Sequence, residues 1–125
     1  MEKFVLHQKT YDFTLWLYPL INRLPQNHRL ILGRKLEEFA LSLLISVMKA
    51  NKARGIERRN FQLESSDTLD YLRIMLRLAK DTRQISVKQY LMSVELLNEI
   101  GRMLTAWIEV AIGITLPTLG HSQRI

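Results

Sequence analysis

Apolar residues recur every three or four positions along most of the chain, the spacing of amphipathic α-helices. The clearest case is the stretch from Asp67 to Asp81. Residues at this spacing lie on one side of a helix and form a stripe wide enough to face a core. The stripe comprises Leu69, Leu72, Leu76 and Ala79, with Tyr71, Met75 and Leu78 beside them.

The same spacing predicts four helices and no strand. We expect them from between Gln8 and Asp12 to Leu24, from Gln26 to Ala53, from Ser65 or Ser66 to between Asp81 and Arg83, and from Ser86 to about Ile112. Pro19 should kink or break the first helix, because proline lacks a backbone donor. Gly101 lies mid-helix, where glycine costs roughly 1 kcal/mol against alanine, so we expect a neighbour close to it.

Four helices joined by short turns indicate an all-α fold, an antiparallel up-down-up-down four-helix bundle. At 125 residues the chain fits one domain. We assign residues 1–113 to the bundle and residues 114–125, which lack periodicity, to a flexible C-terminal tail.

The second helix is apolar on almost every side from Phe39 to Met48. Leu41 and Ile45 lie off its main stripe. A helix in a monomeric bundle buries one stripe, so these two residues indicate a homo-oligomer whose subunits meet along this helix. The alternative is that neighbouring helices of a single bundle cover both sides.

Charge adds a hint about partners. The net charge is +6, and between Arg23 and Arg59 nine Lys or Arg residues face only three Asp or Glu residues. Such a local excess favours a polyanion, either nucleic acid or an acidic protein surface, although a solvated surface is the alternative. The chain has no cysteine, which excludes disulfides and cysteine-ligated metals.

The sequence also bears on location. The N-terminus does not resemble a secretory signal, and Phe39 to Met48 is about half of the roughly 20 residues that span a bilayer. We therefore expect a soluble protein without membrane association.

Two groups of basic residues are candidate binding sites. One lies where the second helix ends and includes Lys52, Arg54, Arg58 and Arg59. Some of these residues could merely offset the negative end of the helix dipole. The other group, Arg73, Arg77 and Lys80, has the spacing of one helical face. Alternatively, Asp70 neutralises Arg73 and Asp81 neutralises Arg77.

Motifs for catalysis or metal binding are mostly absent from the sequence. It has no phosphate-binding loop, nucleophile elbow or Glu-x-x-His carboxylate motif, so we expect no metal and no cofactor. Arg23 and His28 match the Arg-x4-His motif of HEPN ribonucleases, in which a cation holds the phosphate and an imidazole moves a proton. That motif sits on a helix, whereas Pro25 places this one across a turn.

Three ordered blocks resemble the accessory variability determinant (Avd) proteins of diversity-generating retroelements, over roughly Tyr11 to Val110. The blocks are Leu17-Tyr18-Pro19-Leu20 with Leu24-Pro25 and His28, then Leu72-Arg73-Ile74-Met75-Leu76-Arg77, then Glu99-Ile100-Gly101-Arg102-Met103-Leu104-Thr105-Ala106-Trp107-Ile108.

The resemblance implies a small, basic, non-catalytic four-helix protein that assembles as a homopentamer. It implies binding to the retroelement's reverse transcriptase and to RNA or DNA, in support of mutagenic cDNA synthesis. Arg73 and Arg77 occupy the family's Leu-Arg-x-x-Leu-Arg positions, and a bacterial or phage-encoded protein of the cytoplasm is expected. The alternative is a related RNA-associated four-helix protein of the ribosomal RNA intervening-sequence type.

Overall fold

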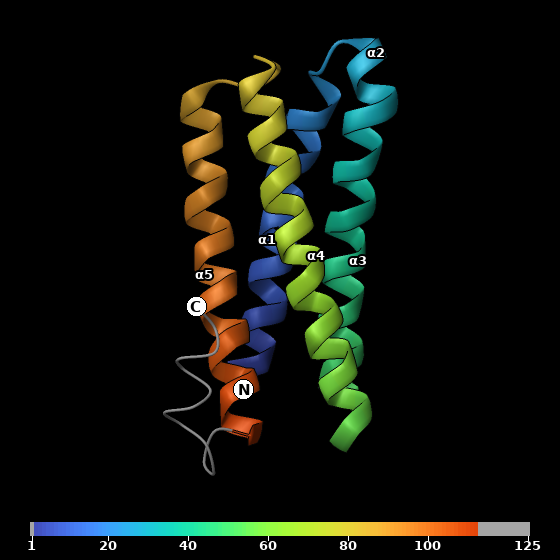
Figure 1. Cartoon of the computed structure of the whole chain (residues 1–125), viewed down its shortest axis with the longest axis vertical. Helices are drawn as coiled ribbons and strands as arrows, with labels where there is room; N and C mark the ends of the chain where they lie inside the picture. The colour runs from blue at the N-terminus through green and yellow to red at the C-terminus, as the bar shows by residue number, and fades with distance from the viewer. Residues whose placement is uncertain (1, 113–125) are drawn as a thin grey trace.

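The chain folds into long antiparallel helices (Figure 1). The computed structural model describes residues 2–112, and within this range every regular element is helical. The elements are α1 (Glu2–Asn22), α2 (Gln26–His28), the π-helical segment η1 (Arg29–Gly33), α3 (Arg34–Lys52), α4 (Gly55–Asp81) and α5 (Val87–Ile112).

Each long helix packs beside two others. α3 contacts α1 and α4, and α5 contacts α4 and α1, so the four helices occupy the corners of a square in chain order. Consecutive long helices run in opposite directions (Figure 1). The antiparallel up-down-up-down bundle expected from the sequence is therefore confirmed for the described residues.

The core lies along the axis of this square. Fully burying a large apolar side chain in this core stabilises the fold by about 1.5–3 kcal/mol. Its largest fully buried apolar members are Leu6, Phe13 and Leu17 of α1, Leu36 and Leu43 of α3, Leu72 and Leu76 of α4, and Leu97, Ile100 and Leu104 of α5. Leu69 and Ala79 are buried too, but Tyr71 and Leu78 are 48% and 49% exposed. The expectation that Tyr71 and Leu78 widen the core stripe was therefore wrong.

The third long helix begins about ten residues earlier than expected. α4 starts at Gly55, not at Ser65 or Ser66. Ser65 is fully buried and exchanges a 2.7 Å hydrogen bond with Ser46 of α3, so it is a core residue and not a helix cap. The prediction was wrong because Gln62, Ser65 and Thr68 occupy core positions of α4, and a count of apolar residues does not detect them.

The first helix is also longer than expected. α1 begins at Glu2 and continues through Pro19 to Asn22, so the helix does not break at this proline. Leu6 and Thr10 are buried and extend the core-facing stripe toward the N-terminus. Thr10 satisfies its hydroxyl by donating to the backbone oxygen of His7 at 2.7 Å.

The second expected helix is confirmed as a nearly continuous helical stretch from Gln26 to Lys52, with one π-helical turn at η1. Gly33 ends this turn where the stretch meets α1. A Cβ at Gly33 would lie 3.1 Å from Ile21 Cγ2, so glycine permits the close approach.

The start of the last helix is confirmed as well. The Ser86 hydroxyl accepts a hydrogen bond from the Gln89 amide at 3.0 Å, and the Gln89 side chain accepts one from the Ser86 amide at 2.9 Å. This reciprocal pair is a capping box, which fixes the N-terminus of α5. The segment 114–125, expected to be a flexible tail, lies outside the described residues.

Candidate nucleic-acid and partner interface

A tight turn between α3 and α4 gathers basic residues at one end of the bundle. α3 ends at Lys52, and Gly55 starts α4 with a φ of 58°, which favours glycine. Lys52 and Arg54 are exposed beside this turn, and Arg59 is half-buried one turn into α4. The turn thus brings four basic residues of the sequence together, and we call Lys52, Arg54, Arg58 and Arg59 the turn cluster.

Arg58 makes more contacts within the fold than the rest of the turn cluster, in which Arg54 donates one hydrogen bond, from Nη1 to the Ala53 oxygen at 3.0 Å. The Arg58 Nε lies 2.9 Å from the Ala50 oxygen and 3.0 Å from the Ala53 oxygen, and Nη2 donates to the Asn51 oxygen at 3.2 Å. The group also lies over the Trp107 ring, 5.6 Å from its centre. Arg58 therefore caps the C-terminus of α3, the structural role that the sequence allowed for some of these residues.

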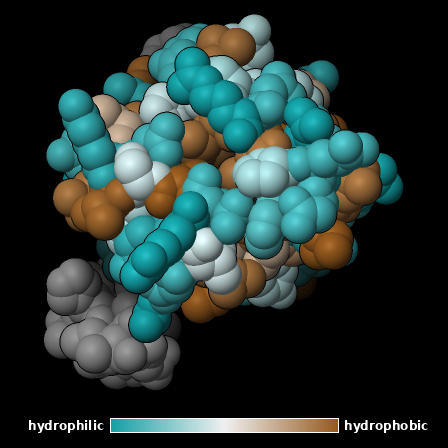
Figure 2. Space-filling view, turned by 90° about the horizontal axis from the view of Figure 1, so that it is seen from above, coloured by the Kyte–Doolittle hydropathy of each residue, from teal (hydrophilic) through white to brown (hydrophobic). Residues whose placement is uncertain are grey.

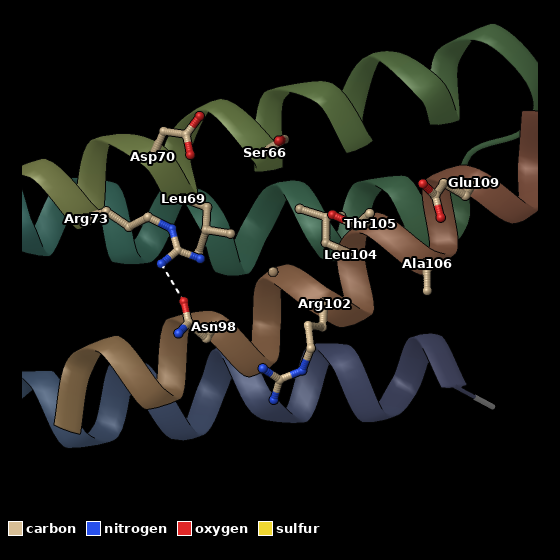
Figure 3. Close-up of a pocket in the computed structure, with 11 residues that line it drawn as sticks. Ser66, Leu69, Asp70, Arg73, Asn98, Arg102, Leu104, Thr105, Ala106 and Glu109 are labelled. Carbon is tan, nitrogen blue, oxygen red and sulfur yellow. Dashed lines mark hydrogen bonds between the residues drawn. The ribbon is translucent and has the colours of Figure 1, made fainter. Parts of the chain in front are cut away.

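Arg73 likewise joins two helices. Its Nη1 donates to Asn98 Oδ1 at 2.8 Å, and Nη2 donates to the Leu97 oxygen at 3.2 Å (Figure 3). The expected close neighbour of Gly101 is this guanidinium, because a Cβ at Gly101 would lie 3.0 Å from Arg73 Nη2. Arg73 does not end on Asp70, which points away from α5 in the figure.

Arg77 and Lys80, which share a helical face with Arg73, have acidic or aromatic partners. Arg77 is exposed, and its Nε lies 3.7 Å from Asp81 Oδ2, so the expected pairing of these two residues is confirmed. Lys80 is half-buried, 3.2 Å from Asp81 Oδ1 and 4.8 Å from the centre of the Tyr90 ring. Such exposed pairs contribute about 0–1 kcal/mol, so Arg77 stays available to a stronger anionic partner.

An open groove of about 450 Å³ runs between α4 and α5 beside Arg73. Arg102 lines it as well, but its side chain points away from α4, toward α1 (Figure 3). The groove also carries Asp70 and Glu109, so its charge is mixed. Two guanidinium groups therefore do not converge here on one anion.

Basic residues also occur at the opposite end of the bundle. Of the nine basic residues between Arg23 and Arg59, four lie from Arg23 to Lys35 at or near the start of α3, four form the turn cluster, and Lys49 lies about one turn before Lys52. A helix of 19 residues spans roughly 28 Å. Seen end-on, the end that carries the α4–α5 connection is largely hydrophilic, and hydrophobic atoms appear around its rim (Figure 2). The basic side chains of this segment thus gather at two separate ends of the bundle.

Arg23 and His28 lie at that opposite end. Arg23 is exposed just beyond α1, and His28 is half-buried in α2. Arg23 lies in the turn after α1 and His28 in the next helical segment, with Pro25 between them, so the helical setting of the ribonuclease motif is not reproduced.

Two features are absent from residues 2–112. No group of three or more His, Cys, Asp or Glu residues could hold a metal ion there. No helix in residues 2–112 is both long and apolar enough to cross a bilayer.

Exposed apolar residues lie on the outer side of α3. Leu41 and Ile45 are 38% and 45% exposed, so the bundle itself leaves them partly uncovered. Tyr18 of α1 donates a hydrogen bond to Glu37 of α3. That bond, together with partial burial and the carboxylate charge, raises the pKa of Tyr18 above its ordinary value of 10.0.

Comparison with known proteins places this geometry in a family. The bundle resembles a crystal structure of a protein of unknown function from the S23 ribosomal protein family of Bacteroides thetaiotaomicron, with a TM-score of 0.80 and 18% identity over 87% of this chain and 99% of that chain. At this identity the likeness shows the fold alone. A search of curated proteins gives no match. The model of the bAvd-like family matches residues 4–111, nearly the whole bundle, and the chain therefore belongs to the bAvd-like family.

Proposed function

We propose that this protein is a non-catalytic accessory subunit of a diversity-generating retroelement, which binds the element's reverse transcriptase and RNA or DNA during mutagenic cDNA synthesis. The observation that carries the proposal is the family match over residues 4–111.

For nucleic acid, the strongest candidates are the basic side chains with unused donors. Lys52, Arg54 and Arg59 have no carboxylate partner among the described residues, and Lys52 and Arg54 are exposed. Arg77 is a further candidate, since it is exposed and weakly paired. Arg58, Arg73 and Lys80 have partners inside the bundle, so we assign them a supporting role.

Binding through such side chains should be governed by phosphate contacts and not by base recognition. No sheet of exposed aromatic side chains, which stacks bases in many single-strand binders, occurs in the described residues. We therefore propose weak sequence specificity and a strong dependence on salt. We also propose a homo-oligomer, in which Leu41 and Ile45 lie at subunit contacts and several turn clusters act together.

A salt titration of binding tests the nucleic-acid part of this proposal. Wild type and the triple variant Lys52→Gln, Arg54→Gln, Arg59→Gln are titrated with labelled single-stranded RNA and DNA. The plot of log K against log salt has a negative slope, and loss of three phosphate contacts should make this slope shallower by about 2. The matched control, Arg23→Gln, Arg83→Gln, Lys88→Gln, removes the same charge from the opposite end. Equal losses in both variants would contradict the assignment to the turn cluster.

A further inference from the structure

The buried side of α4 changes character halfway along the helix. The buried residues of its second half are all apolar, whereas those of its first half are all polar, namely Gln62, Ser65 and Thr68. The first half, residues 55–68, has three apolar side chains and none of them is buried. Ile56 and Leu63 are 78% and 43% exposed, and Phe61 is half-buried. Burial of apolar area therefore holds the second half of α4 in the bundle but contributes little to the first half.

Gln62 is the least satisfied of the three buried polar residues. Its side chain is 1% exposed, and its Nε2 has no hydrogen-bond partner among the described residues. A buried amide donor without a partner destabilises the closed helix, and contact with water would satisfy it.

Most hydrogen bonds of the other two polar residues do not fasten this half to its neighbours. The Ser65 hydroxyl donates to the Phe61 oxygen and the Thr68 hydroxyl to the Glu64 oxygen, both at 2.9 Å. Both bonds lie within α4, so they persist whether or not the helix packs against the bundle.

The named contacts of this half with other helices are polar and lead mainly to α3. Ser65 shares a 2.7 Å hydrogen bond with Ser46, and Arg58 caps the C-terminus of α3. Toward α5, the Arg58 guanidinium lies over Trp107, and the open groove lined by Ser66 separates the two helices (Figure 3). Solvent therefore already reaches the side of this half that faces α5.

We propose that residues 55–68 form a unit that opens by local unfolding while the second half of α4 and the other three long helices stay folded. Regions with few buried apolar contacts open at a lower free energy than the rest of a fold. Gln62 is hydrated in the open state, so its unpaired amide sets how often the unit opens. The opening requires no partner, and the inference therefore goes beyond the proposed function.

Opening of the unit divides the turn cluster. Arg58 and Arg59 belong to the unit, whereas Lys52 and Arg54 precede it. The cluster is therefore held together only in the closed state, and a polyanion that contacts both parts favours that state. This consequence, unlike the opening itself, rests on nucleic-acid binding in the proposed function.

Hydrogen–deuterium exchange of the full chain, without nucleic acid, measures the opening. We expect the amides of residues 60–68 to exchange at least about tenfold faster than those of residues 70–79, which lie in the same helix. Gln62→Met removes the unpaired donor and should slow exchange of residues 60–68 by about tenfold. Equal exchange in the two halves of wild-type α4 would overturn the proposal, and this comparison stands even if the variant does not fold.

A matched control replaces a buried polar residue elsewhere. Ser93 is 1% exposed in α5, one turn beyond Tyr90, which packs on Lys80 at the other end of α4. Ser93→Ala should leave the exchange of residues 60–68 unchanged. Equal effects of Ser93→Ala and a folded Gln62→Met on these amides would contradict the role of Gln62.

A repeat of the measurement with saturating single-stranded RNA tests the consequence for the turn cluster. Bound RNA should slow the exchange of residues 60–68 further, and the triple variant Lys52→Gln, Arg54→Gln, Arg59→Gln should lose this effect. Bound RNA that leaves the exchange unchanged would overturn the link between opening and the turn cluster. Fast exchange of residues 60–68 in a protein that binds no RNA would defeat the proposed function and leave the opening intact.

Discussion

The Arg73 guanidinium lies against Gly101: a Cβ at position 101 would be 3.0 Å from Arg73 Nη2 and 3.3 Å from Leu69 Cδ2. Alanine is better than glycine inside a helix by about 1 kcal/mol, but here it must displace the arginine. We therefore expect Gly101→Ala to give no gain in the free energy of unfolding of wild type. In an Arg73→Ala background the same change should add roughly 0.5–1 kcal/mol.

Urea denaturation of wild type, the two single variants and the double variant provides the measurement. The same effect of Gly101→Ala in both backgrounds would show that the two residues do not interact. Arg73→Ala should also remove its hydrogen bonds to Asn98 and Leu97, so its effects on partner binding need comparison with the more exposed Arg77→Ala.

Arg58 should matter more for stability than any other member of the turn cluster. Arg58→Ala removes hydrogen bonds from a charged group to three backbone oxygens, and we expect a loss of about 2–3 kcal/mol in unfolding free energy. Arg59→Ala is the matched control and should change stability by less than about 0.5 kcal/mol.

Two further readouts separate the cap from a general effect of charge. Arg58→Lys should restore little stability, because an ammonium group lacks the planar fork that reaches several carbonyls. Tryptophan fluorescence should change in both Arg58 variants, since the guanidinium lies over Trp107. Wild-type stability in Arg58→Ala would refute the capping role.

The Tyr18–Glu37 hydrogen bond predicts a pH effect at the alkaline end. Because the folded-state pKa of Tyr18 is raised, the stability from this bond is fully present below about pH 10 and is lost as pH rises through the folded-state pKa. Glu37→Gln should lower the Tyr18 pKa toward its ordinary value. Tyrosinate absorbance, with Tyr18→Phe subtracted, measures this pKa, and an unchanged value in Glu37→Gln would contradict the contact.

Local patterns in the sequence were sufficient to predict the bundle. Leu72 and Leu76 repeat with the helical period and are fully buried, and Ser86 begins α5 with the expected cap. The first turns of α4 were missed because Gln62 and Ser65 are buried polar residues, whose place depends on α3. Tyr71 was misplaced because a wide apolar stripe has two edges, and only tertiary packing decides which edge faces solvent.

The candidate site was less predictable than the fold. Spacing placed Arg73, Arg77 and Lys80 on one face, but it could not show that Arg73 ends on Asn98 and Lys80 beside Tyr90, since those partners belong to another helix. The position of Arg58 after a helix end was a usable signal for its capping role.

Co-purification with the reverse transcriptase of the same retroelement tests the central claim most directly. The two proteins are co-expressed with a tag on the transcriptase, washed in moderate salt after nuclease treatment, and the retained protein is quantified. We expect the folded wild-type protein to be retained on the tagged transcriptase. Failure of the folded wild-type protein to co-purify, with or without nucleic acid present, would contradict the account.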